Sequence, residues 1–145
     1  MSETKKEITA VLYKFSDDNV CDAFETLMKT NPDVKLRLYL DGEENNADKK
    51  CGNVLQKAFG SERVALKFST VKNHAKFMIR DLGTENEEGM FGSFNLSGNS
   101  MSSNTENAFV VCDHNTLQQM TDSFYVLWNK KVKTERAVSK LDTSA

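Results

Sequence analysis

The sequence has few of the residues that build metal centres and disulfide frameworks. Its 145 residues include two histidines, three cysteines and one proline. The cysteines Cys21, Cys51 and Cys112 are far apart, and no C-x-x-C pair occurs, so we expect neither a disulfide framework nor a zinc site. With two histidines, a metal site would need carboxylates, and none are arranged for it. The sequence therefore predicts no metal and no cofactor.

Long apolar runs are also missing. No segment approaches the roughly 20 apolar residues that a membrane-spanning helix needs. The first ten residues, MSETKKEITA, lack the apolar centre of a secretory signal. We therefore expect a cytoplasmic protein without a membrane anchor.

An excess of positive charge is absent as well, since the formal net charge is -2. A domain that grips nucleic acid with its whole surface is usually basic. Any binding of a polyanion by this chain would have to come from a local basic patch and would be sensitive to salt.

The composition that remains is typical of one globular domain. Hydrophobic residues make up 39% and charged residues 28% of the chain. We expect a single domain over residues 1–132, because 145 residues are too few for two cores. Residues 133–145 are polar and are predicted to form a flexible tail.

The hydrophobic periodicity alternates between strand and helix patterns. The run at 8–15 is apolar on both faces and predicts a fully buried strand, whereas 34–41 alternates strictly and predicts a half-buried one. Further strands are expected at 64–69, 75–80, 90–94 and 107–112, and helices from Asp17 to Asn31, at 47–59 and at 117–128. This order favours an α/β (α+β) fold with a single mixed sheet flanked by helices.

One short motif, H-x-K-x-x-x-x-D, brings together residues suited to phosphate chemistry. It consists of His74, Lys76 and Asp81. Alternate residues of a strand point to the same face, so we expect the first two side chains to lie together. Lys76 can neutralise a phosphate oxygen while His74, which is neutral near pH 7, attacks phosphorus.

Two later segments carry groups that can complete such a site. In Gly92-Ser93-Phe94-Asn95, the hydroxyl of Ser93 and the amide of Asn95 can donate to the same phosphate. Farther along, Glu106 followed by Asn107 offers a carboxylate that can accept from the second ring nitrogen of the histidine. Each segment alone also has a simpler explanation, as a chance pair, a turn or a loop. Their order along the chain favours a functional site.

Other charged and aromatic residues have simpler explanations. His114 stands at the start of the last helix, where a surface role is expected. Phe124, Leu127 and Trp128 are expected in the core. Four basic residues flank the histidine motif and are candidates for a local basic patch: Lys67, Lys72, Lys76 and Arg80.

This combination of motifs resembles the phospholipase D-like superfamily, whose signature is H-x-K-x4-D followed by G-S-x-N. It is most similar to the small endonucleases of that family that carry a single motif. The matching residues are His74, Lys76, Asp81, Gly92, Ser93, Phe94, Asn95, Glu106 and Asn107, and the segment from Tyr13 to Asp18 resembles the family's Y-x-F-T/S segment.

The resemblance implies a metal-independent phosphodiesterase that works through a phosphohistidine at His74. Because the chain has one motif, the second histidine would be His74 of another copy, which implies a homodimer. Asp81, Gly92 and Asn107 would be structural. We expect a nuclease that cleaves DNA or RNA. The alternatives are a phosphodiesterase for a phospholipid such as cardiolipin, and a catalytically silent binding module.

Overall fold

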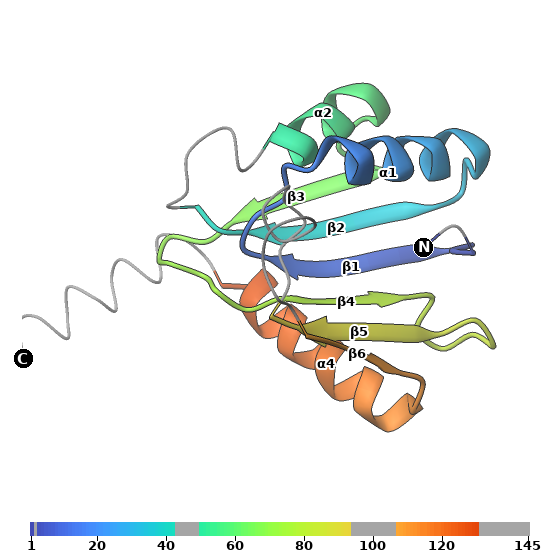
Figure 1. Ribbon diagram of the computed structural model, residues 1–145, viewed down its shortest axis with the longest axis vertical. Helices are drawn as coiled ribbons and strands as arrows, with labels where there is room; N and C mark the ends of the chain where they lie inside the picture. The colour runs from blue at the N-terminus through green and yellow to red at the C-terminus, as the bar shows by residue number, and fades with distance from the viewer. Residues whose placement is uncertain (2, 43–49, 94–106, 131–145) are drawn as a thin grey trace, which may run out of the picture.

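Six strands form one mixed β-sheet in the computed structural model of the protein, which describes residues 1, 3–42, 50–93 and 107–130 (Figure 1). The strands are β1 (Glu7–Leu12), β2 (Lys35–Leu40), β3 (Val64–Phe68), β4 (Phe77–Arg80), β5 (Glu88–Gly92) and β6 (Ala108–Val111). Their order in the sheet is β3-β2-β1-β4-β5-β6. The first three strands run parallel to one another, and the other three join by antiparallel pairing. The predicted fold class, a single mixed sheet flanked by helices, is confirmed.

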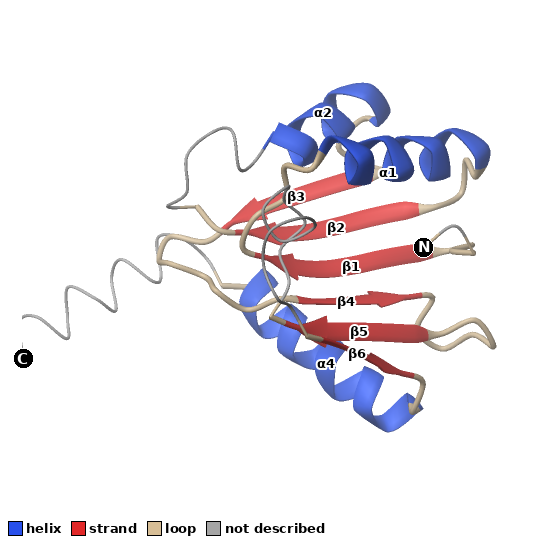
Figure 2. Ribbon diagram, viewed as in Figure 1, coloured by secondary structure: helices blue, strands red, loops and turns tan. Residues whose placement is uncertain are grey.

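Two helices connect the parallel strands, as parallel pairing requires. Helix α1 spans Asp18–Thr30 and helix α2 spans Lys50–Phe59. The first begins where the Asp17 carboxylate accepts a hydrogen bond from the amide of Val20 at 3.0 Å, which satisfies a free donor of the first turn. Both helices lie on the same face of the sheet (Figure 2).

The third helix, α4 (His114–Trp128), covers the opposite face. Successive residues of β1 point to opposite faces: Ala10 and Leu12 pack in the core under α1 and α2, whereas Val11 packs against Phe124 of α4. The strand is therefore buried on both sides, as its sequence predicts.

The expectation of a half-buried β2 is wrong for its last residues. Tyr39 is buried although it faces away from α1 and α2, because α4 packs over that face. Arg37 on the same face donates a hydrogen bond to the hydroxyl of Tyr125 in α4. Because Arg37 and Tyr39 carry polar atoms, the sequence of β2 alternates between polar and apolar residues. Helix α4 nevertheless covers the carbon atoms of both side chains.

The expectation that the chain has no disulfide framework also needs correction, because one disulfide is present. Cys21 of α1 and Cys51 of α2 form a disulfide, with Cα atoms 5.5 Å apart. The two residues are 30 positions apart in sequence, but successive helices on one face of the sheet pack side by side. Cys112 is free and exposed.

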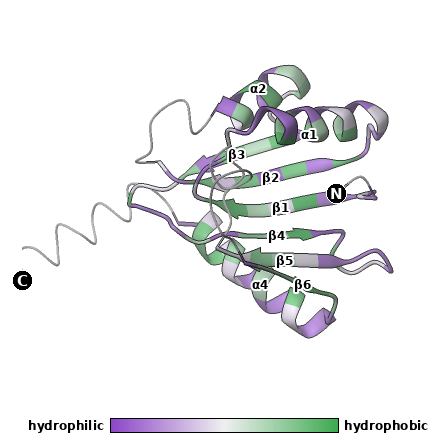
Figure 3. Ribbon diagram, viewed as in Figure 1, coloured by the Kyte–Doolittle hydropathy of each residue, from purple (hydrophilic) through white to green (hydrophobic). Residues whose placement is uncertain are grey.

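Hydrophilic sequence collects at the turns (Figure 3). The turn between β4 and β5 is polar, whereas the strands carry much of the hydrophobic sequence. Within the described residues, no helix is both long enough and apolar enough to cross a membrane. The predicted tail, residues 133–145, lies outside the described residues.

Candidate active site

The candidate site lies at one end of the sheet, where β1, β2, β3 and β5 end and β4 and β6 begin (Figure 1). Loops that follow the carboxyl ends of parallel strands meet at such an edge, and this is where α/β proteins commonly bind ligands. His74 and Lys76 stand just before β4, and Ser93 stands just after β5. His74, Lys76 and Ser93 therefore lie at the same end of the sheet.

His74 and Lys76 lie in an extended segment before β4 rather than in the strand itself, which corrects the expected strand at 75–80. Their side chains nevertheless meet. The ammonium nitrogen Nζ of Lys76 lies 3.0 Å from Nδ1 and 3.4 Å from Nε2 of His74. It also donates to the backbone oxygen of His74 at 2.9 Å. Lys76 is buried with 6% of its surface exposed, whereas His74 is exposed. A buried cation thus supports a histidine that solvent can reach.

A buried carboxylate holds the segment that leads into His74. Asp41, which directly follows β2, accepts a hydrogen bond from the amide of Asn73 at 2.6 Å. The hydroxyl of Ser69 lies 3.4 Å from the same carboxylate and donates to the oxygen of Val71 at 2.5 Å. No motif in the sequence singles out Asp41. Its position at the end of a buried strand is the signal that could have found it.

Tyr13, just after β1, is a second residue that the sequence motifs did not place in the site. Its ring packs against the imidazole of His74 with the centroids 4.7 Å apart. The ammonium groups of Lys14, Lys72 and Lys76 lie 5.5–5.6 Å from the same ring centroid. The tyrosine belongs to the segment that resembles the family's Y-x-F element, so a signal was present without a role attached to it.

The glycine-serine motif is brought to the histidine by backbone pairing. The amide of Gly92 donates to the oxygen of Lys76 at 3.4 Å. Ser93 and Asn107 exchange two bonds, from the amide of Ser93 to the Asn107 oxygen and from the amide of Asn107 to the Ser93 hydroxyl, both at 3.0 Å. A Cβ atom on Gly92 would lie 2.0 Å from the oxygen of Asn107. Only glycine permits this close approach of β5 and β6.

Asp81 lies at the far end of β4 from His74. It is five positions beyond Lys76 along a nearly extended chain, a span of roughly 16 Å. Its carboxylate accepts hydrogen bonds from the amides of Lys5, Lys6 and Glu7 at 2.9, 2.7 and 3.0 Å. Burial raises the pKa of Asp81, but these three amides and Asn86 outweigh it and hold the pKa below its usual range. These contacts all lie away from the histidine.

Two of the predicted site residues, Asn95 and Glu106, lie outside the described residues, as does Phe94. The expected basic patch needs correction. Lys72 and Lys76 stand beside His74, but Arg80 stands at the other end of β4, where it pairs with Glu3 and Glu88 at 3.2 and 3.5 Å. Lys67 donates to the backbone oxygen of Trp128 at 2.6 Å. Lys14 is far from the histidine motif in sequence, but its ammonium group lies beside Tyr13 and belongs to this patch.

The second histidine, His114, is the first residue of α4 and is exposed. Its Nδ1 atom lies 2.9 Å from a carboxylate oxygen of Glu87. The amide of Gly83 and the imidazole of His114 lower the pKa of Glu87. This pair lies at the end of the sheet opposite His74, in agreement with the expected helix-start position. In the part of the chain that the structure describes, no three His, Cys, Asp or Glu side chains are grouped to hold a metal ion.

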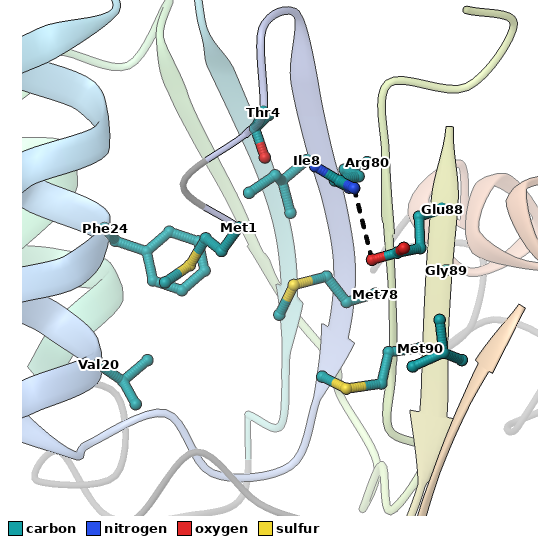
Figure 4. Close-up of a pocket in the computed structure, with 11 residues that line it drawn as sticks. Met1, Thr4, Ile8, Val20, Phe24, Met78, Arg80, Glu88, Gly89 and Met90 are labelled. Atoms are coloured by element: carbon teal, nitrogen blue, oxygen red, sulfur yellow. Dashed lines mark ion pairs between the residues drawn. The ribbon is translucent and has the colours of Figure 1, made fainter. Parts of the chain in front are cut away.

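A cavity of about 230 Å3 opens on the face of the sheet beside α1 (Figure 4). Its walls are largely apolar and include Phe24, Met78 and Met90, with the Arg80–Glu88 ion pair at one side. None of the described residues that match the histidine and glycine-serine motifs lines it. It is therefore separate from the candidate site.

Several known proteins are similar to this chain. Nuc from Salmonella typhimurium, a phospholipase D family member, superposes with a TM-score of 0.74 at 20% identity, over 88% of this chain and 81% of Nuc. NucT from Helicobacter pylori gives 0.65 at 17% identity over the same shares. The archaeal chromatin protein TrmBL2, whose structure shows a novel mode of DNA binding, gives 0.60 at 16% identity, over 88% of this chain and 44% of TrmBL2. No curated protein sequence matches the chain. At these identities the likeness establishes the fold.

The family is established by a match of a different kind. The family model described as "Cardiolipin synthase, PLD-like domain" matches residues 1–128, which is most of the chain and includes the histidine motif, the glycine-serine motif and all six strands. The chain therefore belongs to the phospholipase D-like family.

Proposed function

We propose that this protein is a phosphodiesterase that cleaves nucleic acid, with His74 as the nucleophile. The observation that carries the proposal is the pairing of an exposed imidazole with a buried ammonium group 3.0 Å away. Only a neutral imidazole has a lone pair to offer that ammonium. A neutral imidazole is also the form that attacks phosphorus.

Lys76 has two roles in the proposed reaction. Before substrate binds, its Nζ atom contacts the ring nitrogens of His74. When a phosphate oxygen takes over as its acceptor, the ring nitrogen is released and the phosphorus atom becomes more electrophilic. Ser93 follows Gly92, whose amide bonds to the backbone of Lys76, and in the proposed reaction its hydroxyl donates to the same phosphate. Asn95 and Glu106 complete the proposed set, as a second donor and as the acceptor that orients the ring.

The reaction proceeds in two displacements. The ring nitrogen of His74 forms a bond to phosphorus as the bond to the leaving oxygen breaks, and a general acid protonates that oxygen. Water then attacks phosphorus, the phosphorus–nitrogen bond breaks, and the conjugate base of the same acid takes the proton from water. We assign the acid to His74 of a second copy, because the described residues hold a single histidine at this end of the sheet.

We place the second copy against β6, the last strand of the described sheet. Phe109 and Val110 on β6 are 59% and 64% exposed, and Phe109 stacks on Phe91 of β5 with centroids 5.3 Å apart. Exposed apolar side chains on an edge strand are a common surface for a second chain. We expect wild type to sediment as a dimer and Phe109→Glu to sediment as a monomer that no longer cleaves. A monomeric wild-type protein with full activity would contradict the shared site.

The proposal is tested by cleavage of single-stranded DNA, double-stranded DNA and RNA in excess EDTA, with wild type, His74→Ala and His114→Ala. We expect wild type and His114→Ala to cleave at least one substrate and His74→Ala to cleave none. Full activity in His74→Ala would refute the mechanism. The description of the matching family model names cardiolipin synthase, so the same proteins are also assayed for product from cardiolipin vesicles. Product from lipid but from no nucleic acid would favour a phospholipid substrate, and no product from any arm would favour a silent binding module.

A further inference from the structure

Positive charge is concentrated around one tyrosine at the His74 end of the sheet. The ammonium groups of Lys14 and Lys72 each lie 5.6 Å from the ring centroid of Tyr13, and that of Lys76 lies 5.5 Å from it. The chain as a whole has a net charge of -2. Three ammonium groups therefore gather beside the nucleophile in a protein whose net charge is negative.

Such a group of like charges is held together against electrostatic repulsion. The ring of Tyr13 offsets part of that repulsion, since a cation over an aromatic face gains about 0.5–1 kcal/mol at an exposed site. A ligand anion beside this ring would be attracted by the ammonium groups. The arrangement is therefore suited to a ligand with negative charge beyond that of a single phosphate.

The three lysines differ in their access to such a ligand. Lys76 is buried and contacts His74, so it serves the phosphate that is attacked. Lys72 is exposed, and Lys14 is partly exposed. Tyr13 stands between these two lysines and the imidazole, since its ring centroid is 4.7 Å from that of His74. Lys14 and Lys72 thus lie next to the reacting centre, beside the ring that packs against the imidazole.

We propose that Lys14 and Lys72, arranged around Tyr13, bind a second phosphate of the substrate, next to the one that His74 attacks. The ligand class is a nucleic acid strand with at least two consecutive phosphodiesters. This inference rests on the proposed function and narrows its substrate. Acyl chains of a lipid would need an apolar surface, and the apolar cavity lies on the α1 face beside Arg80 rather than beside Tyr13 (Figure 4).

The test measures binding, so that it does not depend on cleavage. Anisotropy of a labelled single-stranded oligonucleotide is titrated with His74→Ala protein, alone and with Lys14→Gln and Lys72→Gln added. The matched control adds Lys35→Gln and Lys57→Gln, two exposed lysines on β2 and α2 that remove the same charge. We expect the site variant to bind at least tenfold more weakly than the control variant. We also expect the slope of log affinity against log salt to fall by about 0.7, the loss of one phosphate contact on a single strand.

Two results would overturn the inference. One is equal affinity and equal salt dependence in the site and control variants. The other is binding to cardiolipin vesicles that depends on Lys14 and Lys72 with no such dependence for the oligonucleotide, which would assign the second phosphate site to a lipid.

In the background with His74 intact, bis(p-nitrophenyl) phosphate reports on the chemistry, because it has one phosphodiester. We expect replacement of Lys14 and Lys72 to lower the cleavage of the oligonucleotide at least tenfold more than the cleavage of this small substrate. Equal losses of cleavage for both substrates would place the two lysines in the chemical step and contradict the inference. A wild-type protein that cleaves neither substrate but shows the binding difference would refute the proposed function and leave the second phosphate site intact.

Discussion

Replacing Asp81 by Asn removes one negative charge from a fully used carboxylate and leaves the shape of the side chain unchanged. The carboxylate is 1% exposed and accepts four hydrogen bonds, three from backbone amides at 2.7–3.0 Å and one from the Asn86 amide at 2.6 Å. The Asn side chain has one oxygen, which can keep about two of these bonds. Its NH2 group then faces donors that have no acceptor.

The magnitude follows from the bonds that are lost. A hydrogen bond to a charged group contributes about 1.5–3 kcal/mol, so we expect Asp81→Asn to lower the free energy of unfolding by about 3 kcal/mol. In a chain of this size that corresponds to a fall of about 10 °C in the melting temperature. The backbone itself should tolerate the change, because φ at Asp81 is 49° and Asn accepts this left-handed region about as well as Asp.

The pH dependence gives a second, independent check. The pKa of Asp81 lies below its usual range in the folded protein. Its contribution to stability is therefore fully present above the unfolded pKa of about 3.9, and it is lost as the pH falls through the folded pKa. The difference between wild type and Asp81→Asn should be largest near neutral pH and should shrink in acid.

Urea unfolding and thermal melts from neutral pH to pH 3 measure this difference, with Asp33→Asn as the control because Asp33 is an exposed carboxylate in the turn before β2. Where the Asp81→Asn protein is folded, it should retain nearly the wild-type rate of cleavage. Equal stability of the two variants would refute the structural role of Asp81. Loss of cleavage in a stable, folded Asp81→Asn protein would place the residue in the chemistry instead.

Three further outcomes are expected. Gly92→Ala should lower both stability and cleavage, since its Cβ atom would lie 2.0 Å from the oxygen of Asn107; an unchanged melt would show that the two strands separate readily. Cys21→Ser should lower the free energy of unfolding by about 3–4 kcal/mol under oxidising conditions, as expected for a loop of this length. A reductant should lower the melting temperature of wild type but not that of the variant. If the reductant does not change the wild-type melting temperature, the bond to Cys51 is not formed in solution. Asp41→Asn should lower kcat with a smaller effect on KM, because the segment that carries the nucleophile is loosened; a change in KM alone would argue against a positioning role.

Much of the fold follows from local sequence signals. The run that became β1 is apolar on both faces, and its burial on both faces follows from that. Asp17 begins α1 by capping its first turn, as aspartate commonly does. The burial of Tyr39 could not be inferred in this way, because the helix that covers it comes from the other end of the chain. Nor could the pairing of Cys21 with Cys51, which depends on how two crossover helices pack.

The residues of the site also fall into two groups, those that a local motif predicts and those that only the fold brings together. His74 and Lys76 are two positions apart, so a local motif was enough to bring them together. Tyr13 and Asp41 follow β1 and β2, and the signals near them, a Y-x-F segment and the end of a buried strand, do not show that residues more than 30 positions later pack against them. Strand order alone brings them to the histidine, since β1 and β2 are parallel and end at the same edge.

The central claim is that His74 forms a bond to phosphorus during the reaction. It is tested most directly by mixing the protein with an oligonucleotide that it cleaves, stopping the reaction in alkaline denaturant, and locating the attached phosphate by mass spectrometry of the peptides. The account predicts a phosphate or nucleotide adduct on His74 in wild type, and no adduct in His74→Ala. Cleavage without any adduct on His74, or an adduct on another residue, would contradict it.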